Sequence, residues 1–574
     1  MTIFDSLKGK KIALCDVIYQ GPSKKTDWHD YITFVYKDLD TGKKTCMNVQ
    51  DPEYDIYEVK PEHRTFRKVR HYIELEKTIR HRVKYKDRYR AIAEIAGKES
   101  EEMAFYKVNF KNKKMLDQLY KYPYVFGADI SIETYYRVIW DSVIGFPEGF
   151  IPSTIYLDIE VDQKDWTGRG IAKHGECPIN AICVTDDTTN TVYQFLLKTP
   201  DNPLIDDFIQ NRQEEFQRTC HEMFDETYGN GNPLTYNIYM LEDEDELIRQ
   251  AWKLIHHLKR DFMMIWNAPY DTVYMEDRMT ILGMNPEEIM CHSDFSSTMI
   301  YFRLDEGIYD QALKRDYYDI SMYTRIINQL SLYPSLRRSK GAIRRLNLGA
   351  VGWAELKDTK LDYTDVGNIV TLPYEDYFRF ALYNIKDTLL QMGINRKCRD
   401  MTTYYNSCYG SYCGYKDGLK QTVSLRSFFY KELLDEGYII GNNANFDNYD
   451  PNEKKNKKKK GFAGAINGDS MLNEFEGLEV FGKKSMFYFG NCIDFDFSSM
   501  YPNIMIVFNI FAVCMIGKLF IDKDERFKTY DKDGGKEFIE DLIAENVHHL
   551  GQKWLGLPSF TALNDMIAKR LQAA

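Results

Sequence analysis

The stretch IYLDIEV at residues 155–161 places two acids, Asp158 and Glu160, inside a short apolar run. On a β-strand, side chains two residues apart point to the same face, so the two carboxylates would project together from the edge of a sheet. Carboxylates held close together repel one another, and a divalent ion with a preference for oxygen ligands, Mg²⁺ or Mn²⁺, relieves that repulsion. Taken alone, the pattern fits a metal-binding strand and also an edge strand with two solvated acids.

The composition indicates a large globular protein. A chain of 574 residues suggests about three or four domains of roughly 150 residues each, and 44% of the residues are hydrophobic and 14% aromatic. The formal net charge of −11 argues against a generally basic nucleic-acid coat protein but leaves room for a local basic groove.

Cysteines and apolar runs indicate the compartment. The eleven cysteines are dispersed and form no C-x-x-C pair, which predicts a reducing, cytoplasmic environment and no zinc site. The N-terminus has no apolar signal core. The most apolar run, residues 504–516, is shorter than the roughly 20 residues of a membrane helix, so we expect a buried core segment and no membrane partner.

The first domain, residues 1–150, is expected to be rich in β-structure. Residues 11–57 alternate polar and apolar side chains and contain the turn signal Thr41-Gly42, which predicts a small antiparallel sheet. Residues 64–90 are dense in Arg, Lys and His. They could follow a phosphate backbone or form a solvated face of helix and loop, and both interpretations stay open.

A second domain, residues 151–398, should contain a mixed sheet with helices. Residues 178–184 and 193–197 are short apolar runs that predict two strands beside the first, and residues 201–235 read as a polar inserted loop with some helix. Residues 244–259 have helical spacing. Residues 262–266 form a continuous apolar run, typical of a strand buried on both faces, and end in N-A-P-Y-D before a second helical segment that reaches residue 282.

A late helix carries another acid. Within the helical pattern of residues 371–393, Tyr383 and Asp387 are four residues apart and therefore share one helix face. Asp387 could reach a metal while the Tyr383 hydroxyl, one turn away, orients a water molecule.

The order D-x-E, N-x-x-Y-D and Y-x-x-x-D, each in its expected element, resembles the three exonuclease motifs of family B DNA polymerases, a group that includes those of large tailed bacteriophages. The resemblance implies a 3′–5′ exonuclease of RNase H-like fold with two Mg²⁺ or Mn²⁺ ions. In a two-metal site the ions activate a water and stabilise the leaving 3′ oxygen. The implied metal ligands are Asp158, Glu160, Asp271 and Asp387. Tyr383 would position the attacking water, and Asn267 and Tyr270 would contact the substrate strand.

Residues 399–460 are expected to connect this domain to the next. N-S-C-Y-G at residues 406–410 matches a nucleotide-binding pentapeptide of the same family, but it precedes the polymerase carboxylate motif and lacks the family's lysine, so we interpret it as a coincidence in a connecting helix. The lysine-rich segment 449–461 is expected to be a mobile surface loop, and its lysines could also hold phosphates. Phe462-Ala463-Gly464-Ala465 then resembles the Y-x-G-G/A segment that touches the template strand, and Gly464 would allow close backbone approach.

The stretch DFDFSSMYPNIM at residues 494–505 resembles D-x-x-S-L-Y-P-S-I-I, the first polymerase carboxylate motif of the family. It implies that residues 461–574 form the N-terminal part of a polymerase palm. Asp496 would hold the catalytic metals, Ser499 would contact substrate, and Tyr501 would stack under the incoming sugar and exclude a ribose 2′-OH. Neither K-x-x-x-N-S-x-Y-G nor D-T-D, which follow in complete polymerases of the family, occurs after this motif.

The expected function is therefore an N-terminal subunit or fragment of a replicative DNA polymerase, with a complete proofreading exonuclease and half of a polymerase site. Its implied partners are primer-template and single-stranded DNA, deoxynucleoside triphosphates, a second polypeptide carrying the rest of palm, fingers and thumb, and a sliding clamp. A stand-alone exonuclease would have no use for Asp496 and Tyr501. A non-catalytic scaffold subunit would have no use for the full set of exonuclease acids.

Overall fold

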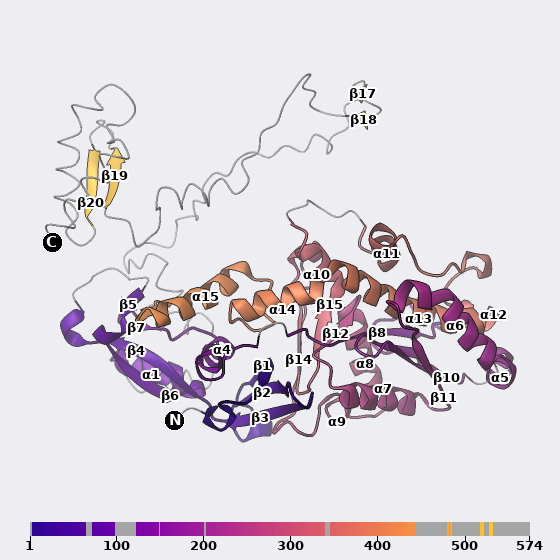
Figure 1. The fold of residues 1–574 in the computed structure, drawn as a ribbon, viewed down its shortest axis with the longest axis horizontal. Coiled ribbons are helices and arrows are strands. Elements are labelled where there is room, and N and C mark those ends of the chain that lie inside the picture. The colour runs from indigo at the N-terminus through magenta and orange to yellow at the C-terminus, as the bar shows by residue number, and fades with distance from the viewer. Residues whose placement is uncertain are drawn as a thin grey trace. The chain divides into compact units, whose positions relative to one another are not determined.

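A six-stranded mixed sheet forms the right-hand part of the larger unit as drawn in Figure 1. Its strand order is β11-β10-β9-β8-β12-β15. Strands β8, β9 and β10 are antiparallel neighbours, whereas β11 runs parallel to β10, and β12 runs parallel to both β8 and β15. The strands are β8 (Thr154–Val161), β9 (Ile179–Asp186), β10 (Thr191–Leu197), β11 (Thr235–Leu241), β12 (Phe262–Ile265) and β15 (Arg325–Asn328).

This computed structural model describes residues 3–64, 72–97, 122–147, 150–199, 202–338 and 345–442, together with four short strands further along. The chain divides into two units, Met1–Glu453 and Lys454–Ala574. In the second unit, β17 (Glu479–Val480) pairs with β18 (Lys483–Lys484), and β19 (Gly517–Ile521) pairs with β20 (Phe527–Asp531), both antiparallel. The lysine-rich segment, the apolar run 504–516 and the motif residues Phe462, Gly464, Asp496, Ser499 and Tyr501 lie outside the described residues.

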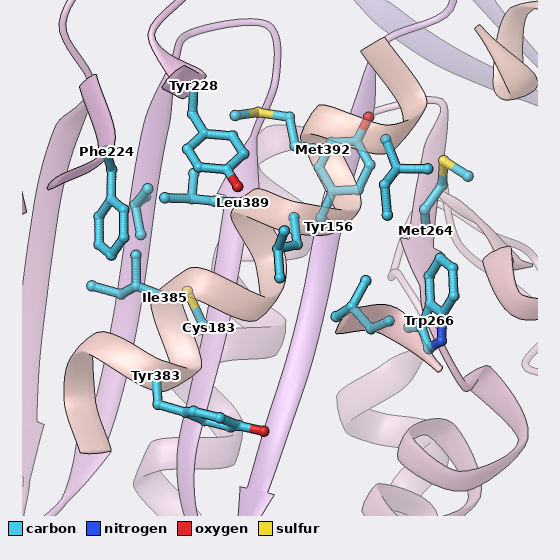
Figure 2. Close-up of a cluster of buried hydrophobic side chains, with 14 of the residues drawn as sticks. Tyr156, Cys183, Phe224, Tyr228, Met264, Trp266, Tyr383, Ile385, Leu389 and Met392 are labelled. Atoms are coloured by element: carbon cyan, nitrogen blue, oxygen red, sulfur yellow. The ribbon is translucent and has the colours of Figure 1, made fainter. Parts of the chain in front are cut away.

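Helices cover both faces of the six-stranded sheet, which explains why β12 is apolar along its whole length. On one face, α13 (Tyr377–Cys398) places Ile385 and Leu389 over Tyr156 and Cys183 of β8 and β9 (Figure 2). On the other face, α7 (Glu244–Leu258) and α8 (Ala268–Ile281) bury apolar side chains against the sheet. The predictions of a buried strand at residues 262–266 and of a helix at residues 244–259 are confirmed.

The segment between β10 and β11 is more helical than its sequence suggested. It forms α5 (Pro203–Asp207), a π-helical turn at Phe208–Arg212, and α6 (Gln213–Tyr228). Four side chains of α6, each four residues from the next, are buried: Phe216, Cys220, Phe224 and Tyr228. In a polar sequence this single apolar stripe is enough to pack the helix against α13.

Two small antiparallel sheets form the N-terminal region. The predicted one consists of β1 (Ile12–Gln20), β2 (Tyr31–Asp38) and β3 (Lys44–Gln50), and Gly42 in the β2–β3 turn has φ 71°, a conformation that glycine adopts without strain. The second contains β4 (Glu53–Val59), β6 (Thr78–Lys84) and β7 (Val125–Phe126). Alongside them lie β5 (Tyr72–Glu74), which pairs with β16 (Tyr438–Ile440), and the helices α1 (Arg88–Ile95) and α4 (Ile132–Val143).

The basic stretch of residues 64–90 is partly a strand, whereas a helix and loop face was the alternative considered. On β6, Arg82 donates to Asp55 of β4 at 3.0 Å, and Arg80 bonds the same carboxylate. Lys84 and Lys86 both pair with Asp51, at 2.9 and 2.5 Å. The ion pairs of Arg80 and Arg82 with Asp55 cross from β6 to β4, and cross-strand pairs of this kind stabilise a sheet. These cations therefore already have acidic partners within the fold.

Buried ion pairs join the sheet of β1, β2 and β3 to the six-stranded sheet. Lys44 of β3 lies 2.7 Å from Asp261, which directly precedes β12. Asp16 of β1 accepts from Arg325 of β15 at 2.7 Å and from Arg137 of α4 at 3.3 Å. All of these side chains are more than nine-tenths buried.

The remaining elements complete the larger unit. They are α9 (Pro286–Met290), β13 (Ile300–Arg303), β14 (Tyr317–Ile320), α10 (Gln329–Ser335), α11 (Leu348–Leu356), α12 (Leu372–Glu375), α14 (Asp400–Gly410) and α15 (Gln421–Asp435). The pentapeptide at residues 406–410 ends α14, in agreement with its interpretation as part of a connecting helix. Among the described helices, none combines the length and the apolar character that a membrane span requires.

Candidate metal centre

Three acids come together where β8 meets α13. One carboxylate oxygen each from Asp158, Glu160 and Asp387 lies within 4.8 Å of the other two. Oxygens that share one Mg²⁺ at about 2.1 Å lie at most about 4.2 Å apart, so a small rotation of these side chains would let all three contact the same ion. Asp387 is buried, and the other two are half-buried at the surface of the sheet.

Local structure explains how these acids meet. Asp158 pairs with Cys183 and Glu160 with Ala181 of β9, which fixes both side chains on one face of β8. The ladder shifts register directly after Glu160, at the end of the strand. Asp387 lies on the α13 face that packs on this sheet, one turn beyond Tyr383.

A lysine that our sequence analysis did not identify completes the cluster. The ammonium group of Lys360, in the segment between α11 and α12, donates to Asp387 Oδ2 at 2.5 Å and to the Tyr383 hydroxyl oxygen at 2.9 Å. Its surroundings in sequence, D-T-K-L-D at residues 358–362, are typical of many solvated loops. No periodicity or spacing in the sequence distinguishes this lysine from its neighbours.

Asp271 lies beside the cluster, outside the group of three. It occupies the first turn of α8, where the helix follows β12, and its carboxylate accepts from the backbone N–H of Ile159 at 3.5 Å. Asn267 is the exposed N-cap residue of the same helix. The half-buried ring of Tyr270 and the side chain of Glu160 border a hollow of about 80 Å³. The four predicted acids thus come from three elements around the C-terminal end of strand β8.

Crowding of carboxylates in a buried place dominates the electrostatics. Burial, and then the neighbouring charge of Asp387, raise the pKa of Asp158 well above its usual range and that of Glu160 to about 8. Burial likewise raises the pKa of Asp271 to about 7. The pKa of Asp387 is raised by burial, and the Lys360 ammonium works against that rise.

The chemistry of this donor set fits a divalent cation. One lysine offsets only part of the charge of four carboxylates, and a cation lowers their pKa values by stabilising the ionised forms. In addition, Asp387 Oδ1 is buried and has no hydrogen-bond partner among the residues that the structure describes. Buried polar atoms in folded proteins usually have a partner. An unpartnered carboxylate oxygen of this kind is free to coordinate a metal ion.

Comparison with known proteins bears on the C-terminal part of the chain. The family model for DNA polymerase family B matches residues 418–544. This range includes the motif at residues 494–505 and, among the described elements, helix α15 and strands β16 to β20. No curated protein matches the chain. Polymerases act on DNA and deoxynucleoside triphosphates with divalent metals. Residues 418–544 of this chain are a family B DNA polymerase domain.

Proposed function

We propose that the acidic cluster is the two-metal 3′–5′ proofreading exonuclease site of a replicative DNA polymerase, within an RNase H-like domain at residues 151–398. The observation that carries the proposal is the meeting of Asp158, Glu160 and Asp387 beside Tyr383 and Lys360. The polymerase domain at residues 418–544 supports it, because proofreading requires an exonuclease on the polypeptide assembly that extends the primer.

Each side chain has a role that follows from its surroundings. Asp158, Glu160 and Asp387, with Asp271 beside them, would hold the ions. Bound divalent ions lower the pKa of a water molecule and neutralise the phosphate that it attacks.

Lys360 donates to the Tyr383 oxygen, so the Tyr383 hydroxyl hydrogen remains available to hold the attacking water. Asn267 and Tyr270, at the start of α8, would contact the 3′ end of the strand.

The test is digestion of single-stranded DNA labelled at its 5′ end, in Mg²⁺ or Mn²⁺. We expect the full chain to shorten it stepwise from the 3′ end. The double variant Asp158→Asn/Glu160→Gln keeps the side-chain shapes and removes two charged ligands, so it should lose the activity. Glu226→Gln, an exposed acid-to-amide change on α6, is the matched control and should digest like the parent. Equal digestion by the double variant would show that the site is wrongly assigned.

For the polymerase domain we propose that Asp496 holds the metals of nucleotide addition, with Ser499 and Tyr501 at the incoming nucleotide and Phe462 and Gly464 at the template. Nucleotidyl transfer needs carboxylates on both sides of the metal pair, and no D-T-D follows Asp496 in residues 497–574. The second group of carboxylates would then lie outside these 574 residues, and we propose that a second polypeptide supplies it.

Primer extension tests this division of the site. We expect none from the 574-residue chain alone and extension after addition of a candidate second polypeptide, with loss of that extension in Asp496→Ala. Extension by the chain alone that Asp496→Ala abolishes would contradict a site divided between two chains. The exonuclease assay is independent of this outcome.

A further inference from the structure

Strand β11 is an unprotected edge of the six-stranded sheet. It pairs with β10 on one side, and within the described ranges no strand pairs with its other side. The β10–β11 register is regular along the whole strand, without a bulge. Its sequence, TYNIYML, has no charge and no proline. Charges, proline and bulges are the features by which natural edge strands avoid pairing with other chains.

The open edge offers backbone hydrogen-bonding groups. The N–H of Thr235 and the C=O of Leu241 both bond towards β10 and its flanking residues, at 2.9 and 2.8 Å. The N–H and C=O of one residue point to the same side of a strand, and successive residues alternate. Thr235 and Leu241 face β10, so the even-numbered residues of β11 direct their N–H and C=O groups to the open edge. These residues are Tyr236, Ile238 and Met240.

A hollow lies next to this edge, between β11 and α7. It has a volume of about 580 Å³. Tyr239, which is 44% exposed, stacks on Phe195 with ring centroids 5.2 Å apart, and Leu254 of α7 lines the other side. Lys253 and His257, one helical turn apart on α7, also line the hollow, are exposed, and take part in no ion pair with any residue described. The hollow thus combines an apolar floor with a basic wall.

We propose that β11 is the docking edge for an extended, acidic segment of a partner protein. The segment adds as a seventh strand of about seven residues, bonds to the outward backbone groups of β11, and sets alternate side chains into the hollow. Those side chains are apolar where they meet Tyr239 and Leu254, and acidic where they meet Lys253 and His257. The seven residues of β11 in a second copy bring no acid to this pairing, because TYNIYML has none.

The probe is a fluorescent nine-residue peptide, TVTVTETVT, whose even positions would face the hollow. Its binding to the full chain is measured by fluorescence anisotropy, beside a peptide with Lys in place of Glu and a scrambled peptide. We expect the Glu peptide to bind and the other two to bind at least about tenfold more weakly, since like charges across an interface oppose association.

Two variants locate the binding. Lys253→Glu/His257→Glu changes exposed side chains of α7, so the fold is retained; it should weaken the Glu peptide about tenfold and strengthen the Lys peptide. Met240→Pro removes an outward N–H and should weaken both, whereas Met240→Leu, the matched control, should not. No binding of any peptide up to about 1 mM, or binding that neither variant changes, would overturn the proposal. A dimer of the chain that Met240→Pro dissociates would assign the edge to a second copy, and would overturn it as well.

Discussion

Lys360 Nζ lies 2.5 Å from Asp387 Oδ2, so the most deeply buried acid of the cluster is neutralised by a lysine from a separate segment of the chain. The same ammonium bonds the Tyr383 hydroxyl. One side chain therefore fixes two of the groups that the proposed reaction uses.

Replacement of Lys360 by Met should destabilise the metal-free protein. It would leave Asp387 buried and without a countercharge. The cost should be about 1–2 kcal/mol, less than for a fully buried pair, because 35% of the Lys360 side chain is exposed and solvent screens the interaction. Chemical denaturation in EDTA measures it. Lys357→Met, a nearby lysine with no acidic partner among the described residues, is the control and should have little effect.

Divalent ions should stabilise the protein more as the pH rises. The folded-state pKa of Glu160 is about 8, against an ordinary value of 4.5. Between these values the folded state binds more protons than the unfolded one, so this group lowers the free energy of unfolding as the pH increases. Metal binding removes that penalty. We expect Mg²⁺ to raise the melting temperature clearly at pH 8 and hardly at pH 5, as measured by calorimetry.

The double variant Asp158→Asn/Glu160→Gln separates this effect from general ionic stabilisation. Its melting temperature should respond to Mg²⁺ equally weakly at both pH values. A response that matches the parent's at pH 8 would place the ion elsewhere.

Tyr383→Phe should slow digestion while leaving DNA binding intact. The ring remains packed beside Tyr363, at 5.5 Å between centroids, and only the hydroxyl that would hold the water is lost. A general acid or base typically contributes about 10²–10⁴-fold, and a hydroxyl that only holds the water should contribute less, so we expect kcat to fall by about tenfold with KM nearly unchanged. A rise in KM with unchanged kcat would instead make Tyr383 a substrate contact.

Leu389→Ala tests whether the packing of α13 on the sheet positions the site. Leu389 is fully buried between α13 and the sheet, and such truncations cost about 2–5 kcal/mol. Urea denaturation should show that loss, and exonuclease activity should fall at temperatures where the parent is stable. Leu425→Ala, on an exposed position of α15, should change stability by less than about 0.5 kcal/mol.

The sequence predicted those elements whose pattern is uninterrupted. The apolar run 262–266 forms β12, and residues 244–259, with their helical spacing, form α7. A strand buried on both faces and a helix buried along one stripe each require a regular pattern of apolar residues, which can be read from the sequence. The acids on β8 and α13 could be placed for the same reason: each lies at a fixed position in a regular element.

Features that depend on contacts between distant parts of the chain could not be predicted from a local sequence pattern. Lys360 reaches Asp387 from an irregular segment, and its role depends on tertiary packing alone. Helix α6 has a polar sequence with one narrow apolar stripe, and the sequence of residues 201–235 predicts only a polar inserted loop with some helix. The basic residues on β6 are explained by Asp55 on β4, a partner about 25 residues earlier that no local pattern identifies.

The buried pairs Lys44–Asp261 and Asp16–Arg325 set a limit on how this chain can be divided for experiments. Expression of residues 151–398 alone would leave Asp261 without its countercharge Lys44, would leave Arg325 with Asp319 but without Asp16, and would expose these buried side chains to water. Such a fragment should express poorly even though its sequence motifs are complete. A truncation series should therefore keep residues 1–442 together, and a cut between the motif-defined domains would test a damaged protein.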